Sequence, residues 1–128
     1  MHETVFAESL LRLVLEAAQK NEEPGQKLRI EEIVLDVGLL ACLEPQTLEG
    51  CFELLAGGTA AEKARLKINK RPMSGLCPDC GNRVETASRA FACPLCAGQA
   101  VDWQGGHELE ISSIRVIPYI QGQEKLHE

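Results

Sequence analysis

The chain has no long run of apolar residues. Of its 128 residues, 45% are hydrophobic and 25% are charged, and no apolar run approaches the roughly 20 residues that a membrane helix needs. The N-terminus also lacks the basic start and the apolar stretch of a secretion signal, because Glu3, Glu8, Arg12 and Glu16 interrupt its apolar residues. We therefore expect a cytoplasmic protein with no membrane partner.

The sequence has no excess of positive charge either. It contains 13 Lys and Arg residues against 19 Asp and Glu residues, which leaves a formal net charge of −6. Proteins that bind nucleic acid neutralise phosphates with clustered Lys and Arg, so this balance argues against nucleic acid as the main partner. A local basic group does exist, and we interpret it as solvated surface: Lys67, Lys70, Arg71 and Arg83.

Catalytic motifs are absent as well. The sequence shows no pair of nucleophile and base, and no glycine-rich loop that would hold a phosphate. A length of 128 residues allows one substantial core and excludes a large second domain. We therefore expect a protein that is not an enzyme.

Periodicity predicts an α+β fold of two helices and a small three-stranded sheet. Residues 4–20 form the first helix, and the second begins at Pro45 and ends at Gly57-Gly58. Apolar alternation predicts strands at 28–38, 64–69 and 109–116. The core-facing stripe of the first helix has apolar residues at helical spacing, namely Phe6, Leu10, Leu13, Val14, Ala17 and Ala18.

From about Arg71 to Gly106 the character of the chain changes. This stretch has few large apolar residues and many turn formers, so it cannot build a hydrophobic core of its own. We predict an α+β domain of residues 1–70 with 107–120, interrupted by a metal-binding domain of residues 71–106. A flexible tail of residues 121–128 follows.

Four cysteines in two identical knuckles supply the metal site of the insert. The spacing is Cys77-x2-Cys80, then twelve residues, then Cys93-x2-Cys96. Each knuckle places two thiolates on one side of a tight turn, and four thiolates favour a tetrahedral zinc ion. Such a site has no open position for water or substrate, so we interpret the metal as structural and the insert as zinc-ribbon-like.

Other interpretations of the cysteines remain open at this point. A single iron ion fits rubredoxin-like knuckles, and two disulfides fit the cysteine count, although a reducing compartment disfavours them. The two unpaired cysteines, Cys42 and Cys51, have no chelating neighbour in the sequence. We expect both to be small, buried apolar residues.

The chain start is a second candidate metal site. The α-amine of Met1, the amide nitrogen of His2 and its imidazole can chelate one ion through three nitrogens in a plane. Nickel(II) and copper(II) favour such tetragonal nitrogen sites, whereas zinc does not. The fourth donor is left open between the amide of Glu3, its carboxylate and a histidine from elsewhere.

Several stretches together resemble a known family. They are Met1-His2-Glu3, residues 35–38, 52–55, 58–59 and 64–68, the two cysteine knuckles, and residues 106–114. This combination resembles the HypA/HybF family of hydrogenase maturation proteins, and the resemblance extends to about Ile117.

The resemblance implies a nickel metallochaperone that helps to deliver nickel to the large subunit of a [NiFe]-hydrogenase, together with a partner GTPase. Some members of the family also serve urease, so urease maturation proteins are further candidate partners. The resemblance further implies that His2, with the amine of Met1 and with Glu3, binds Ni(II) transiently. In the same way it implies structural Zn(II) on Cys77, Cys80, Cys93 and Cys96.

The chain departs from the family pattern at two positions. Ala97 follows the second knuckle where glycine is common, which affects the turn but should not remove zinc. His107 follows the insert, where it is either an additional nickel ligand or a polar turn residue, and His127 in the tail is a weaker candidate. The competing function is a zinc-ribbon module that binds protein or nucleic acid without nickel, but it leaves His2 unexplained.

Overall fold

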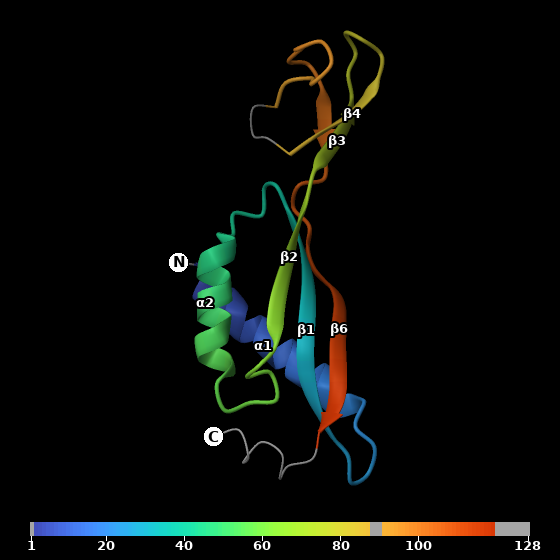
Figure 1. Ribbon diagram of the computed structural model, residues 1–128. Helices are drawn as coiled ribbons and strands as arrows, with labels where there is room; N and C mark the ends of the chain where they lie inside the picture. Colours follow the sequence, from blue (N-terminus) through green and yellow to red (C-terminus); the bar gives the residue numbers. More distant parts are fainter. Residues whose placement is uncertain (1, 88–90, 120–128) are drawn as a thin grey trace. The chain divides into compact units, whose positions relative to one another are not determined.

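The computed structural model describes residues 2–87 and 91–119, without the side chain of His2. Met1, the predicted tail of residues 121–128 and His127 within it lie outside the described residues. The helices and strands follow one another in this order (Figure 1): α1 (His2–Lys20), β1 (Lys27–Gly38), α2 (Pro45–Ala56), β2 (Arg65–Arg71), β3 (Met73–Leu76), β4 (Arg83–Thr86), β5 (Asp102–Gln104) and β6 (Leu109–Tyr119). No helix in this part of the chain is long and apolar enough to cross a membrane.

The chain divides into two compact units. The first unit comprises Met1–Val34, Leu43–Lys67 and Ser112–Glu128, and the second comprises Leu35–Cys42 and Ile68–Ile111. The predicted domain boundaries after residues 70 and 106 stay a prediction. The prediction of an α+β fold with two helices, a three-stranded sheet and an inserted metal-binding region is confirmed.

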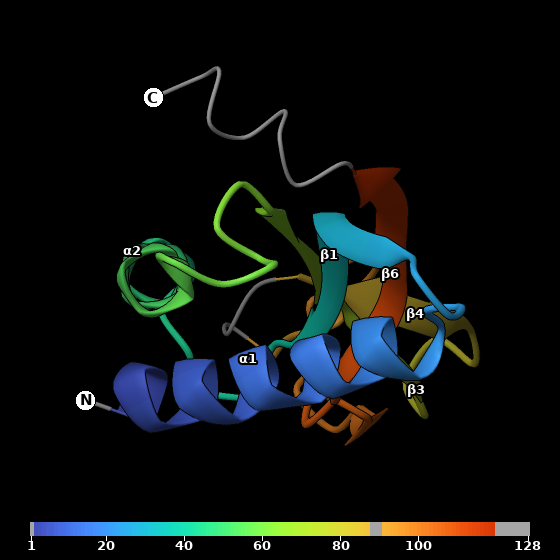
Figure 2. The ribbon, with the colours of Figure 1, turned by 90° about the horizontal axis from the view of Figure 1, so that it is seen from below.

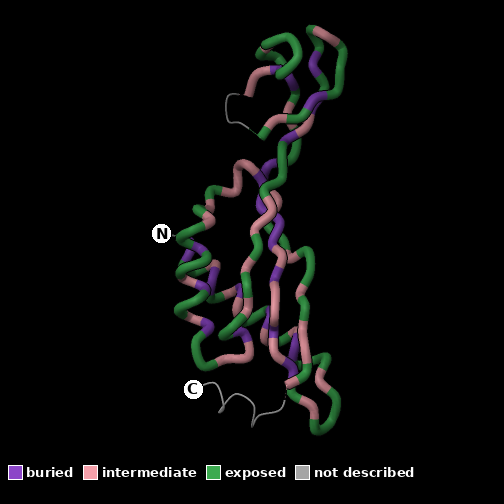
Figure 3. The backbone as a smooth tube through the Cα atoms, in the orientation of Figure 1, coloured by how far each residue is buried: buried purple, intermediate pink, exposed green. Residues whose placement is uncertain are grey.

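The three-stranded sheet of the body has the strand order β2-β1-β6. Helix α1 lies across one face of this sheet in the first unit. In Figure 2, α1 is seen from the side and α2 is seen end-on, so the axes of the two helices are steeply inclined to each other. Figure 3 colours the backbone of buried residues purple. The buried apolar residues that form the core of the first unit are Ala7, Leu10, Val14, Ala18, Leu28, Ile30, Ile33, Leu48, Phe52, Ala56 and Ala61.

The predicted stripe of α1 is wrong at one position. Leu13 is 54% exposed, whereas Leu10 and Val14 are buried. Spacing alone places residues 10, 13 and 14 on the same broad face, but the body of the protein covers only a narrower strip of that face. Ala7 and Ala18 complete this strip, and they lie at spacings of three and four residues from its larger members.

Helix α2 begins at its proline, as predicted. Glu44 is the N-cap, and its side chain accepts a hydrogen bond from the N–H of Thr47 at 3.1 Å. Pro45 then occupies the first turn, where its missing N–H leaves no hydrogen bond unmade. The helix ends at Ala56, and the left-handed residue after it is Gly58, with a φ of 79°.

The two unpaired cysteines are less buried than the sequence predicts. Cys42 is exposed in the turn after β1, where its φ is 56° and its thiol donates to the carbonyl oxygen of Leu40 at 3.4 Å. Cys51 is half-buried on α2, and its sulfur lies 3.4 Å from the hydroxyl oxygen of Thr4. The prediction that both are buried core residues is therefore wrong for Cys42 and only partly right for Cys51.

The second unit contains a small antiparallel sheet that periodicity did not predict. Its strand order is β4-β3-β5, so the central strand β3 pairs with both neighbours. Gly75 in β3 lies opposite Trp103, and a Cβ atom there would overlap the carbonyl oxygen of Asp102. A glycine is needed at this position because the neighbouring strand approaches so closely.

Candidate metal centres

The two cysteine knuckles have the same backbone geometry. In the first, the N–H of Gly81 donates to the carbonyl of Cys77 at 2.7 Å. In the second, the N–H of Ala97 donates to the carbonyl of Cys93 at 2.8 Å. Each turn points the two thiols of its knuckle in one direction, as the spacing predicts.

The four thiols come together at one point. All four sulfur atoms lie within 4.8 Å of one another, with Cys77 and Cys96 3.7 Å apart and Cys80 and Cys93 3.8 Å apart. A tetrahedral zinc ion with Zn–S bonds of about 2.3 Å requires sulfur atoms about 3.8 Å apart. The donor set and its spacing therefore fit a structural zinc ion.

Hydrogen bonds and burial shift the pKa values of two of these thiols, Cys93 and Cys96, in opposite directions. Burial raises the pKa of Cys93, but N–H donors from Leu95 and Cys96, with the neighbouring thiols, outweigh it and lower the pKa to about 7. For Cys96 the N–H of Gly98 lowers the pKa, but the thiol of Cys77, burial and the remaining thiols raise it to about 12. Once one thiol has ionised, its negative charge disfavours ionisation of the thiols beside it. A bound divalent cation offsets this repulsion and allows all four thiols to ionise.

A small apolar cluster supports the site. Cys77 and Cys93 are buried together with Val84 and Val101, and Trp103 packs against this cluster. The indole N–H of Trp103 donates to the carbonyl oxygen of Phe91 at 3.1 Å. The cluster is too small to hold the two knuckles and strands β3, β4 and β5 together by burial alone, which agrees with a metal as the organising element of this region.

The second candidate site begins at the first residue of α1. His2 opens the helix, and the structure describes Glu3 in full. Glu3 is only 6% exposed, and its Oε2 accepts a hydrogen bond from the N–H of Glu44 at 2.9 Å. A hydrogen bond with the α-amine of the chain, and then this one from Glu44, lower the pKa of Glu3 from 4.5 to about 2.

Sequence reasoning did not find the contact between Glu3 and Glu44. The two residues lie 41 positions apart, and no spacing rule connects a helix start to the cap of a later helix. Only the start of α2 was detectable, because Pro45 is suited to the first helical position.

His107 is exposed in the segment between β5 and β6, directly after Gly105 and Gly106. Among the described residues, the four-cysteine cluster is the one group of three or more His, Cys, Asp or Glu side chains whose atoms could share a metal ion. His107 joins no such group there. Its role as an additional nickel ligand therefore stays a prediction.

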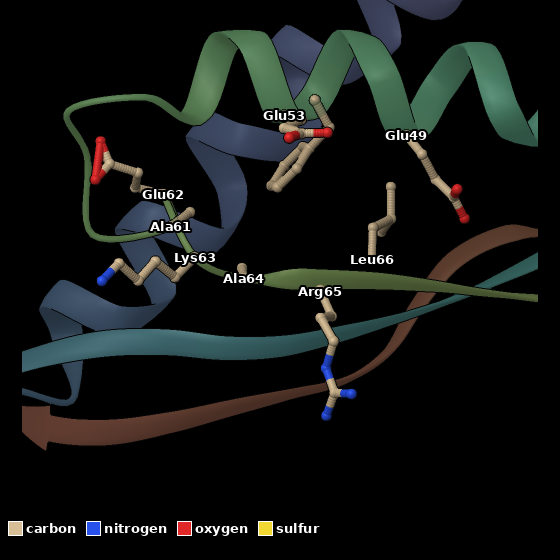
Figure 4. A pocket seen from close by; sticks show the side chains of 9 residues that line it. Glu49, Glu53, Ala61, Glu62, Lys63, Ala64, Arg65 and Leu66 are labelled. Atoms are coloured by element: carbon tan, nitrogen blue, oxygen red, sulfur yellow. The ribbon is translucent and has the colours of Figure 1, made fainter.

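A pocket of about 460 Å³ lies away from both candidate centres, between α2 and the start of β2 (Figure 4). Glu49 and Glu53 of α2 line one side, and Arg65 and Leu66 of β2 line the other. Figure 4 shows Leu66 directed toward α2 and Arg65 directed away from it. The pocket contains none of the predicted metal ligands, so we assign no metal to it.

Fold and site together define a class of protein: a small α+β body with an inserted four-cysteine zinc site. The family model "Hydrogenase/urease nickel incorporation, metallochaperone, hypA" matches residues 1–116. The chain belongs to this family, so the predicted resemblance is confirmed.

Curated relatives and solved structures agree with the family. Hydrogenase maturation factor HypA of Rhizobium leguminosarum bv. viciae is 38% identical, over 91% of this chain and 100% of the relative. The factor of the same name from Dechloromonas aromatica is 34% identical, over 91% and 99%. The solution structure of the nickel metallochaperone HypA from Helicobacter pylori covers 90% of this chain and 97% of its own, with a TM-score of 0.57. At 24% identity it supports the fold alone.

Proposed function

We propose that this protein binds Ni(II) at its N-terminus and helps to insert it into the large subunit of a [NiFe]-hydrogenase. The observation that carries the proposal is the match of residues 1–116 to a family of nickel incorporation metallochaperones. The names of its relatives, hydrogenase maturation factors, support hydrogenase as the client.

Nickel is the cargo, and its ligands in this proposal are the α-amine of Met1, the amide and imidazole nitrogens of His2, and Glu3. Nitrogen donors in a plane suit Ni(II) and exclude the hard cations that prefer oxygen. The start of α1 at His2 supports one part of the proposal, because the first N–H groups of a helix have no partner within the helix, so nickel binding at this amide nitrogen breaks no hydrogen bond of α1. A site made of few donors at a chain end can release its ion to a client.

Zinc is the resident metal, and we assign it to Cys77, Cys80, Cys93 and Cys96. The sulfur distances support this assignment. The ion would hold the second unit together, as four closed thiolate ligands permit no exchange with substrate. The protein therefore acts as a carrier and has no catalytic role.

The partners follow from the delivery step. They are a hydrogenase-maturation GTPase, the hydrogenase large subunit and, where urease is also served, urease maturation proteins. We place the exchange in the cytoplasm, without nucleic acid or membrane.

Nickel titration of the untagged chain beside His2→Ala tests the proposal. The native chain should bind one zinc tightly and one nickel loosely, and His2→Ala should lose nickel while keeping zinc. Equal nickel binding by both chains would refute the N-terminal site, and a native chain that takes up only zinc would favour the zinc-ribbon module. His107→Ala, titrated in parallel, decides between the two interpretations of His107.

A further inference from the structure

Strand β2 lies at an edge of the body sheet. The order β2-β1-β6 gives it one neighbouring strand in the part of the chain that the structure describes. An edge strand presents backbone N–H and C=O groups with which an added strand can pair. The pocket of about 460 Å³ described above lies beside the start of this strand, where Ala64, Arg65 and Leu66 line it. All residues that line the pocket belong to the first compact unit.

Helix α2 lies beside the same edge, on the side of β2 that faces away from β1 (Figures 1 and 2). The groove between the helix and the strand has an apolar floor, since Phe52 and Ala61 are 2% and 1% exposed. Leu66 is half-buried and is directed toward α2 (Figure 4). Ligand pockets typically measure roughly 300–1,000 Å³, so this groove has room for side chains of an added strand.

Two glutamates of α2 make the rim of this groove negative. Glu49 and Glu53 are exposed and lie one helical turn apart on the same face of the helix. Neither forms an ion pair or a side-chain hydrogen bond within the described residues. Arg65 does not neutralise them, because its side chain is directed away from α2 (Figure 4). The adjacent lining residues Glu62 and Lys63 carry opposite charges, so the rim on the side of α2 keeps its negative charge.

These features fit an extended peptide better than a metal ion or a second copy of this chain. Within the described residues, the glutamates of the groove belong to no group of three or more side chains that could share a metal ion. A second copy that paired its own β2 here would bring Arg65 and Lys67 of the two chains together. Like charges that lie opposite each other destabilise a sheet. A peptide with positive side chains toward α2 meets no such repulsion there.

We propose that β2 and the groove beside it bind an extended, basic segment of a partner protein, which adds to the sheet as a further strand. Such binding takes its affinity from main-chain hydrogen bonds and its specificity from alternate side chains. Residues two apart in a strand share a face and lie about 6.6 Å apart, since each residue advances about 3.3 Å. Glu49 and Glu53 lie about 6 Å apart along the helix axis, at about 1.5 Å per residue. Helix α2 runs alongside the start of β2 (Figure 4), so two cations separated by one residue match the two glutamates.

Fluorescent peptides test the charge of the groove. A short peptide in which lysine and threonine alternate is titrated against the full, zinc-loaded chain at low salt, and its fluorescence anisotropy reports binding. In the double variant Glu49→Gln with Glu53→Gln, we expect the affinity to fall about three- to tenfold, as for loss of two exposed ion pairs.

The matched control is Glu8→Gln with Glu16→Gln, which removes the same charge from exposed positions of α1. It should change the affinity by less than about twofold, because these charges lie outside the groove. Equal losses in the two double variants would attribute binding to net charge and would overturn the proposal. Absence of binding to the native chain would overturn it as well. None of these measurements involves nickel, so their outcome is independent of the proposed nickel site.

The spacing and the backbone of the peptide test strand addition. A peptide with as many lysines, placed at every third position, directs them to both faces of a strand and should bind about threefold more weakly or worse. Two further peptides carry N-methyl groups on the odd-numbered or on the even-numbered residues, which removes the N–H donors from one edge at a time. A strand at the sheet edge pairs through one edge, so one of these peptides should bind at least about tenfold more weakly than the other. Equal binding by the two methylated peptides, or by the two lysine spacings, would show that the peptide does not add as a strand.

Discussion

Replacing Ala97 by glycine should strengthen the second cysteine knuckle. Ala97 has a φ of 63°, in the left-handed region, while Gly81 occupies the equivalent place in the first knuckle with a φ of 74°. A left-handed backbone costs a residue with a Cβ atom roughly 1–2 kcal/mol, and glycine adopts it readily. The second knuckle therefore carries strain that the first knuckle avoids.

The size of the effect follows from two opposing terms. Ala97→Gly removes roughly 1–2 kcal/mol of backbone strain from the folded state. Glycine also raises the conformational entropy of the unfolded chain, which lowers the stability of the folded state by about 0.4–1 kcal/mol. The net gain is about 0.5–1 kcal/mol, or about two- to fivefold in zinc affinity, because zinc binding and folding of such units are linked. The matched control is Gly81→Ala, where nothing lies within 4 Å of the new Cβ atom, so the backbone alone should produce a loss of similar size.

Competition with a chelator measures both changes. Trp103 is the only tryptophan of the chain and packs against the cysteine cluster, so its fluorescence reports zinc loading. Affinity should rise in the order Gly81→Ala, native, Ala97→Gly, and the double variant should return close to native. Weaker zinc binding by Ala97→Gly, or no response to either substitution, would refute the argument from strain.

Three further predictions address the two metals and the buried carboxylate of Glu3. Cys77→Ser should lose zinc and unfold the cysteine-bearing insert while much of the α+β body remains folded, because binding energies on the order of 10–16 kcal/mol organise small zinc modules; full zinc content with native circular dichroism would contradict this. An extension before Met1 should weaken nickel binding as strongly as His2→Ala, since it turns the α-amine into an amide; binding should also weaken below about pH 7, where the amine and imidazole, with reference pKa values of roughly 8 and 6.5, retain protons. An extended chain with native nickel affinity would exclude the amine as a ligand. Because folding lowers the pKa of Glu3 from 4.5 to about 2, its stabilising contribution is complete above pH 4.5 and is lost as the pH falls toward 2. Acid unfolding followed by circular dichroism should therefore be less steep in Glu3→Gln, and identical profiles would argue against the stabilising carboxylate.

The four-cysteine site was predictable because its geometry is local. Two residues between the cysteines of each knuckle are enough to set a turn, and the same pair of backbone hydrogen bonds appears in both. Helix α2 was predictable for a similar reason, since Pro45 is suited to the first helical position. Such short-range signals need no knowledge of the rest of the chain.

The errors arose where the outcome depends on distant packing. Leu13 has the periodicity of a core residue, but its neighbours in space leave it exposed. Cys42 has the chemistry of a small buried residue, but the turn after β1 places it outside the core. The sheet of the second unit was missed because β3, β4 and β5 are only 4, 4 and 3 residues long, too short for an alternation to stand out.

The sequence by itself determined the α+β class, the cysteine knuckles and the family, because each depends on residue types at fixed short spacings. Only the tertiary structure decided how the parts of each unit meet. It brought the sulfur atoms of the two knuckles to the spacing of a tetrahedral metal site. It also formed the hydrogen bond from the N–H of Glu44 to the carboxylate of Glu3, 41 residues away in the sequence. Contacts of this kind depend on the packing of whole helices and strands, which no local pattern encodes.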